Sequence, residues 1–209
     1  MGKVLYVQAS PRGERSKSVA VCDAFVEAYR RLHRGDPIET LNLFEADLIP
    51  FDGPAVQAKY TILHGREHTD QELAAWKAVE AVIDNFKSAD RYVFAVPMWN
   101  FSVPYRLKQY IDILVQPGLT FSYSPDEGYR GLVLGKRAFL AYTRGGDYSA
   151  APHDQFDHQK SYLELVLGFM GIEDIRSVVV EPTLMAGPQV AADKLQSATQ
   201  QAQRLAADF

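Results

Sequence analysis

Several features that define large classes of proteins are scarce in this sequence. Its 209 residues include one cysteine, Cys22, so no disulfide can form within the chain, which suits a reducing, cytoplasmic location. No segment approaches the roughly 18 uncharged apolar residues of a membrane span, and the N-terminal apolar run at residues 4–7 is too short for a signal peptide. A formal net charge of −4 gives no electrostatic attraction to nucleic acid or to an anionic membrane, so neither is an expected partner.

The composition is that of a globular protein. Apolar residues make up 47% of the chain and charged residues 23%, which is enough for a real core and excludes the disordered and collagen-like classes. The length fits one α/β domain, and no repeat, low-complexity tract or linker divides it. We therefore expect residues 1–209 to form a single domain.

Short apolar runs alternate with longer stretches of helical period, which is typical of a parallel sheet covered by helices on both faces. Strands are expected at residues 4–8, 38–43, 92–96, 137–142 and 175–180. Helices are expected at residues 18–32, 69–87, 104–115, 162–170 and 191–207. The pattern predicts an α/β fold with an open parallel sheet.

The first expected helix is amphipathic. Val21, Phe25, Ala28 and Leu32 recur at spacings of three and four residues, which predicts one buried stripe. Cys22, one position after Val21, is expected to be half-buried packing.

Two segments interrupt the alternation. Residues 44–69 show no clear period and contain proline and glycine, so they are predicted to form a long excursion over the surface. The helix that follows is expected to open with a capping box, Thr69 to Glu72. Residues 117–135 have the composition of a hairpin-rich insertion.

Ligands of open parallel sheets bind beyond the C-terminal ends of the strands, and three loops there have unusual composition. The first, residues 10–18, carries the hydroxyls of Ser10, Ser16 and Ser18 and the charge of Lys17. Free N–H groups and the dipole at a helix N-terminus make an anion site, which suits a phosphate. Its glycine spacing matches neither the P-loop nor the dinucleotide fingerprint. The alternative is a solvated loop with an N-cap.

The second and third loops favour a flat ligand. Residues 97–104 place aromatic, thioether and amide side chains in one turn, which suits a planar ring, although a hydrophobic turn packed under a neighbour has the same composition. In residues 143–147 the paired glycines permit close backbone approach, although Gly-Gly after a strand is also an ordinary turn. All three loops are expected at one end of the sheet, in the order that flavin mononucleotide (FMN) requires.

One segment makes a specific resemblance. The pattern Pro97-x-Trp99-Asn100-Phe101-x-x-Pro104-x-x-Leu107-Lys108-x-x-Ile111-Asp112 resembles the signature of the flavodoxin-like NAD(P)H:quinone and azo-dye reductases. The bacterial FMN-dependent NADH-azoreductases are the nearest group, and the likeness extends over essentially the whole chain. It implies a doubly wound, five-stranded parallel sheet in the order 2-1-3-4-5 with helices on both faces.

The resemblance also implies an activity. FMN would carry two electrons from NADH or NADPH to small aromatic acceptors, namely azo dyes and quinones, by a ping-pong scheme in a homodimer with a shared active site. Trp99 stands where these enzymes often carry Tyr, and Thr143 where they often carry Ser, which leaves the choice of acceptor and of nicotinamide open.

The family pattern implies the following site residues. The FMN phosphate and ribityl chain would be held by Ser10, Ser16, Lys17 and Ser18. The isoalloxazine ring would be lined by Pro97, Met98, Trp99, Asn100 and Phe101. Its other polar edge would be closed by Thr143, Arg144, Gly145 and Gly146, with Arg144 stabilising negative charge on the reduced flavin. Tyr123 and, from the second subunit, Phe169 would wall the pocket above the ring, and Tyr123 is also the candidate proton donor.

Other readings stay open. A flavodoxin-type electron carrier would bind FMN without oxidising a nicotinamide itself, and an FMN-binding regulatory protein would show negligible turnover. The long segments 44–69 and 117–135 favour an enzyme with a built-up pocket. His153 and His158, with Asp154 and Asp157 between them, have a spacing that supports a metal site poorly, so no metal is expected.

Overall fold

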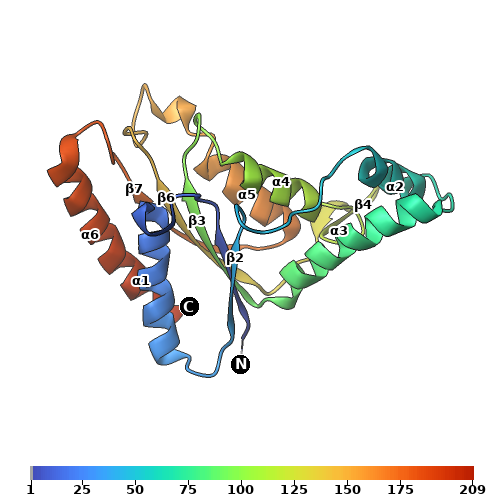
Figure 1. Cartoon of the computed structure of the whole chain (residues 1–209), viewed down its shortest axis with the longest axis horizontal. Helices are drawn as coiled ribbons and strands as arrows, with labels where there is room; N and C mark the ends of the chain where they lie inside the picture. The colour runs from blue at the N-terminus through green and yellow to red at the C-terminus, as the bar shows by residue number, and fades with distance from the viewer. Residues whose placement is uncertain (1) are drawn as a thin grey trace.

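A computed structural model describes residues 2–209. Its centre is a sheet of five parallel strands in the spatial order β2-β1-β3-β6-β7 (Figure 1). The strands are β1 (Val4–Gln8), β2 (Ile38–Asn42), β3 (Arg91–Pro97), β6 (Arg137–Thr143) and β7 (Asp174–Val180). Counted within the sheet this is 2-1-3-4-5, so the predicted strands and their order are confirmed.

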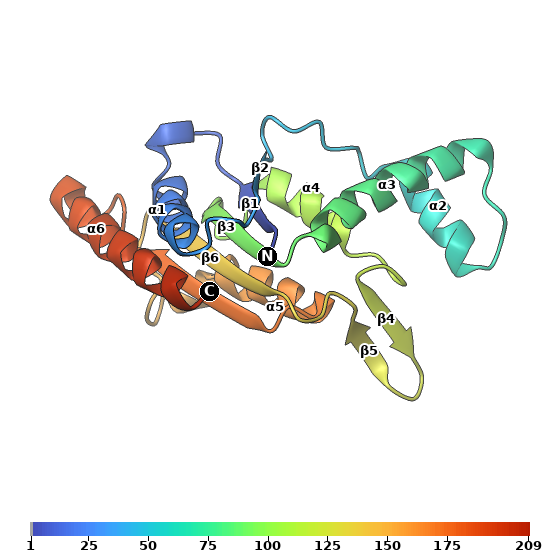
Figure 2. The same cartoon turned by 90° about the horizontal axis from the view of Figure 1, so that it is seen from below.

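Helices cover both faces of this sheet (Figures 1 and 2). One face is covered by α1 (Lys17–Leu32) and α6 (Gly187–Leu205), and the other by α3 (Asp70–Ser88), α4 (Tyr105–Leu114) and α5 (Lys160–Met170). Side chains alternate between the two resulting cores: Leu5 and Val7 pack with α3, α4 and α5, whereas Val4 and Tyr6 pack with α1 and α6. Burial on both faces explains why the central strands read as continuous apolar runs.

The buried face of α1 differs in part from the predicted stripe. Val21 and Phe25 are buried as expected, but Leu32 is 59% exposed and Cys22 is fully buried rather than half-buried. Tyr29 makes the last contact instead, with its ring 6.3 Å from that of Phe209 and edge-on to it. Leu32 lies at the margin of the stripe and in the final turn, so spacing alone placed it wrongly.

The surface excursion predicted for residues 44–69 contains a helix, α2 (Gly53–Leu63), which the sequence reading missed. Its buried face consists of the small residues Ala55, Ala58 and Thr61, and the Thr61 hydroxyl donates to Glu72 on α3. Small side chains give a weak hydrophobic signal, and the large apolar residues of α2 point outward instead. The helical period was therefore hidden.

The remaining local predictions hold. Thr69 and Glu72 form the capping box at the start of α3. The insertion contains an antiparallel hairpin of β4 (Phe121–Ser124) and β5 (Gly128–Gly131), and Figure 2 shows it projecting from the body beside the α2–α3 pair. Within residues 2–209 no helix has both the length and the apolarity to cross a membrane.

The packing of α1 makes a first prediction. Phe25 is fully buried, with its ring stacked 4.0 Å from Phe139. We expect Phe25→Ala to lower the free energy of unfolding by about 3–5 kcal/mol, because a cavity adds to the lost burial. Leu32→Ala on the same helix should change it by less than about 0.5 kcal/mol. Urea denaturation followed by circular dichroism measures both, and equal losses would contradict the observed packing.

Candidate functional site

The loop after β1 forms an anion-binding helix start. Ser16 is the N-cap of α1, and its Oγ accepts from the N–H of Val19 at 3.4 Å and lies 3.1 Å from Oγ of Ser18. The hydroxyls of Ser10, Ser16 and Ser18 are all on buried residues. In the described part of the chain the N–H groups of Lys17 and Ser18 have no hydrogen-bond partner. Free donors at the positive end of a helix dipole favour an anion here.

The loop after β3 contains a strained turn. Trp99 and Ser102 exchange two backbone hydrogen bonds of 2.9 and 3.0 Å, and the two residues between them have positive φ angles, 47° at Asn100 and 69° at Phe101. This is the geometry of a type I′ turn, which glycine or asparagine usually supplies. Holding Phe101 there costs on the order of 1–3 kcal/mol. The turn directs the N–H groups of Asn100 and Phe101 away from any partner among residues 2–209.

The loop after β6 lies against two others. The carbonyl oxygen of Thr143 accepts from the N–H of Met98 at 2.8 Å, which ties this loop to the aromatic turn. The carbonyl oxygen of Gly145 accepts from the N–H groups of Leu184 and Met185, both at 3.1 Å. A Cβ at Gly145 would lie 3.1 Å from the end of the Leu184 side chain, so the two loops are in close contact. The loop after β7 therefore belongs to the site.

These loops enclose a cleft of about 140 Å³ at the C-terminal ends of the strands. Its lining is Ser10, Arg12, Ser16, Lys17, Pro97, Met98, Trp99, Thr143, Gly145, Thr183 and Leu184. Most of these residues are the ones that the sequence predicted. Thr183 and Leu184 were missed, although the position of their loop after a strand end was a signal that could have found them.

An apolar pocket of about 320 Å³ lies on the other side of the Gly145–Gly146 turn. It is lined by Phe101, Gly146, Asp147, Tyr148, His153, Phe156, Pro182 and Met185. The Phe101 ring lies 6.3 Å from that of Tyr148 and 5.5 Å from that of Phe156. Hydrogen bonds from the Ser149 hydroxyl and N–H lower the pKa of Asp147, so its carboxyl is charged near neutral pH. Aromatic side chains, together with the absence of a side chain at Gly146, suit a planar ring.

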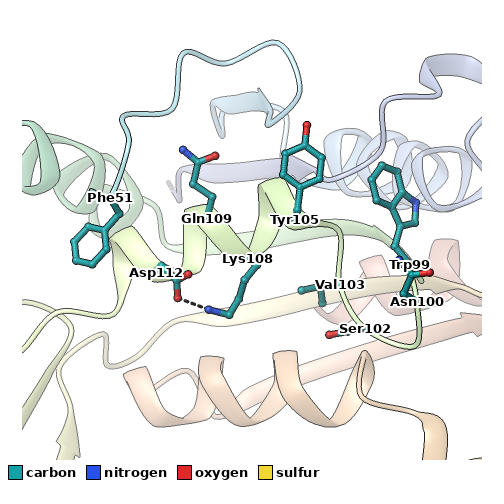
Figure 3. Close-up of a pocket in the computed structure, with 9 residues that line it drawn as sticks. All are labelled: Phe51, Trp99, Asn100, Ser102, Val103, Tyr105, Lys108, Gln109 and Asp112. Atoms are coloured by element: carbon teal, nitrogen blue, oxygen red, sulfur yellow. Dashed lines mark hydrogen bonds and ion pairs between the residues drawn. The ribbon is translucent and has the colours of Figure 1, made fainter. Parts of the chain in front are cut away.

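A third depression runs along α4 (Figure 3). Trp99 and Asn100 stand at one end of this groove and Phe51 at the other, and its volume is about 650 Å³. Lys108 and Asp112 form an ion pair of 2.5 Å within it. Trp99 thus borders both the cleft and the groove, while Asn100 borders the groove alone.

The Arg144 side chain is held in a buried network behind the loop after β6. Its guanidinium group is 2% exposed and is held by Asp157 and Glu181 at N···O distances of 2.6 and 3.2 Å. Its Nε donates to Gln159, so all three nitrogens are occupied. Arg144 cannot extend towards a flavin ring without breaking this network. The three partners were missed because they are distant from it in sequence.

Tyr123 and Phe169 lie on the hairpin and on α5. Tyr123 lies on β4 and is 62% exposed, and it joins Tyr129, Phe121 and Phe169 in one aromatic cluster on the hairpin and α5. Neither residue lines the cleft or the apolar pocket of its own subunit.

The histidines of the loop before α5 serve other contacts. The N–H of His158 donates to the carbonyl oxygen of Phe101 at 3.0 Å, and His153 lines the apolar pocket. Across residues 2–209, no three histidine, cysteine or acidic side chains come together as metal ligands would.

The strand order and the phosphate-suited helix start define a flavodoxin-like α/β protein. A family model described as the flavodoxin-like fold matches residues 2–206. An FMN-dependent NADH:quinone oxidoreductase of Nitratidesulfovibrio vulgaris is 53% identical over 210 residues, covering all of both chains. FMN-dependent NADH:quinone oxidoreductase 3 of Pseudomonas fluorescens is 38% identical, and the match covers 99% of this chain and 96% of that enzyme.

Solved structures agree with these sequence relatives. An azoreductase from Bacillus anthracis superposes with a TM-score of 0.91 at 30% identity over the full length of both chains. An FMN-dependent NADH-azoreductase from the same species, solved in complex with FMN, gives 0.85 at 29% identity and covers 99% of this chain and all of its own. The chain therefore belongs to the flavodoxin-like family, and its relatives there are FMN-dependent NADH:quinone oxidoreductases and NADH-azoreductases, which confirms the resemblance.

The strained turn makes a second prediction. Alanine at position 101 keeps the penalty of a positive φ, whereas glycine does not, so Phe101→Gly should be more stable than Phe101→Ala by about 1 kcal/mol. At Gln201, exposed in the interior of α6, the order should reverse, with glycine about 1 kcal/mol less stable than alanine. Thermal denaturation of the four variants tests this, and the same order at both positions would refute the turn geometry.

Proposed function

We propose that the protein is an FMN-dependent NADH:quinone oxidoreductase that also reduces azo compounds. The observation that carries this proposal is the position of the phosphate-suited cleft directly beside the apolar pocket, across one Gly-Gly turn. The names of the relatives point to the same donor, cofactor and acceptors.

The residues of the site fit FMN. The hydroxyls of Ser10 and Ser16, the N–H groups at the start of α1 and the ammonium of Lys17 suit a phosphate and the polar chain attached to it. Thr143 and Gly145 continue the cleft towards the apolar pocket. No carboxylate lines the cleft, so no like charge opposes a phosphate there.

A planar ring would then be bounded by aromatic side chains and backbone. The free N–H groups of Asn100 and Phe101 can donate to polar atoms at the edge of the ring, while Phe101 and Gly146 contact apolar parts. When bound, FMN supplies the two-electron chemistry that links nicotinamide oxidation to acceptor reduction. Donor and acceptor would occupy the same pocket in turn, as a ping-pong scheme requires.

A flavodoxin-type carrier is the second candidate, since the fold and the phosphate loop are common to both. The aromatic pocket beside the cleft, formed in part by residues 147–156, favours an enzyme because a carrier has no need to bind a nicotinamide. Reduction of the bound FMN by NADH without a separate reductase distinguishes the two candidates, because only the enzyme would be reduced.

A homodimer would complete the site. Tyr123, Tyr129, Leu134 and Leu165 are each more than 60% exposed on the hairpin, the segment after it and α5, which is an unusual concentration of large apolar side chains. A second copy that covers this surface would bring Tyr123 and Phe169 of the partner subunit to the ring. We also place the enzyme in the cytoplasm, since its only cysteine is unpaired and buried.

The spectrum of the purified protein tests the proposed activity. We expect a yellow protein that bleaches at about 450 nm on anaerobic addition of NADH and recovers when a quinone or an azo dye is added. Comparison with NADPH ranks the two donors. A protein that binds FMN but is not reduced by either nicotinamide would be a carrier, and one that takes up no FMN would refute the proposal.

Ser18→Asp gives the same experiment a matched variant. A carboxylate beside Ser16 repels a phosphate, so the Kd for FMN should rise by at least about tenfold. Ser197→Asp makes the same change on the exposed face of α6 and should bind FMN as the wild type does. Equal affinities of the two variants would place the phosphate elsewhere.

Sedimentation velocity tests the dimer. Leu165→Asp puts a charge into the exposed apolar surface and should raise the dimer dissociation constant by about tenfold or more. Leu32→Asp, at the end of α1, is a comparably exposed control that should leave the dimer intact. A wild type that sediments as a monomer would overturn the shared-site proposal.

A further inference from the structure

Arg144 is the most deeply buried cation of the site, and each of its three side-chain nitrogens donates a hydrogen bond. The guanidinium donates from Nε to Gln159, from Nη1 to Glu181 and from Nη2 to Asp157, at 3.0, 3.2 and 2.6 Å. The Asp157 and Glu181 side chains are themselves only 18% and 13% exposed. Burial of three charged groups is costly unless each is well paired, so this arrangement needs a reason.

Each partner continues to a different wall of the site. Oε2 of Glu181 also accepts from the N–H of Tyr148 at 2.9 Å, which fixes the wall of the apolar pocket. Nε2 of Gln159 donates to the carbonyl oxygen of Val96 at 2.9 Å, at the end of β3. The carbonyl oxygen of Arg144 accepts from the N–H and hydroxyl of Thr183, which lines the cleft.

Asp157 links the same network to the strained turn. Its Oδ1 accepts from the N–H groups of Gln159 and Lys160 at 3.1 and 3.0 Å, which fixes the chain at the start of α5. His158, which lies between Asp157 and Gln159, donates its N–H to the carbonyl oxygen of Phe101. Positive φ angles persist only where the surroundings hold them, and this is such a support.

We propose that Arg144, Asp157 and Glu181 form a positioning unit that holds the loops after β3, β6 and β7 in the shape of the FMN seat and sets the charge beside it. The inference rests on the proposed function. None of the three side chains lines the cleft or the apolar pocket, so they act through Tyr148, Gln159 and the start of α5, while the main chain of Arg144 holds Thr183. The unit explains why an arginine directly before the Gly-Gly turn is buried rather than directed at the ligand.

The unit has a net charge, which should affect the midpoint potential of bound FMN. A merely structural role would not depend on the sign of the charge that is removed. One guanidinium and two carboxylates sum to −1 (one positive and two negative charges). Salt screens such buried charges weakly. Reduction adds electrons to the flavin, so removal of the arginine charge should lower the midpoint potential of bound FMN. Removal of a carboxylate charge should raise it.

Three variants of the full-length protein test the unit: Arg144→Gln, Arg144→Lys and Glu181→Gln. Fluorescence titration should show that each binds FMN about tenfold more weakly, since each breaks part of the loop support. Spectroelectrochemistry should give a lower midpoint potential for Arg144→Gln, a higher one for Glu181→Gln and an unchanged one for Arg144→Lys, which keeps the charge. Arg144→Lys and the near-isosteric Glu181→Gln keep the test decisive if Arg144→Gln fails to fold.

The exposed ion pair of Glu27 and Arg31 on α1 provides matched controls. Glu27→Gln and Arg31→Gln remove the same charges far from the site and should match the wild type in both measurements. Potentials that shift in one direction, or affinities equal to the wild type, would overturn the positioning unit while the proposed function stands. A wild type that binds no FMN would overturn the proposed function instead. In that case the unit is tested by amide hydrogen exchange at Tyr148 and Thr183 in Arg144→Lys. Exchange rates equal to the wild type would overturn the unit, and faster exchange would support it.

Discussion

The register between β3 and β6 is the constraint on which the site depends. The two strands pair Pro97 with Thr143, and the N–H of Met98 extends this alignment by donating to the carbonyl oxygen of Thr143. The aromatic loop and the Gly-Gly loop therefore leave the sheet at the same level. On the other side, β1 pairs Gln8 with Ala95, which brings the serine-rich helix start to that level as well. Two-residue changes in this register would separate the three loops by more than the length of a hydrogen bond.

Backbone strain and a buried arginine lie together at this end of the sheet. Two consecutive residues with positive φ and an arginine with two carboxylates all lie within a few residues of the strand ends. The opposite end of the sheet has a surface ion pair of Lys3 with Glu39 and a more buried pair of Arg91 with Asp36, and among the described residues neither is accompanied by a strained turn. A protein tolerates unfavourable local geometry where the packed strands hold it and where a ligand benefits from it.

The sequence predicted the sheet well because its signals are local. Continuous apolar runs, a capping box and the strand-to-helix loops each lie within a few residues, and the loops with free donors and glycines were located by the rule for open sheets. The helix α2 was missed because its buried residues Ala55, Ala58 and Thr61 are small. The burial of Arg144 was not foreseen because its partners are up to 37 residues away, and no spacing rule connects them. The same limit applies to the aromatic cluster of Tyr123 and Phe169, which only the folded hairpin brings together.

One close backbone contact has a thermodynamic consequence. A Cβ at Gly131, at the end of the hairpin, would lie 2.3 Å from the main-chain nitrogen of Gly171, and the N–H of Val133 donates to Met170 nearby. The hairpin is thus clamped to the end of α5 rather than swinging from it. The backbone of the hairpin is therefore already positioned in the isolated chain, so association with a second copy would not need to order it. Rigidity at this joint, far from the strand ends, would then contribute to affinity at the subunit contact.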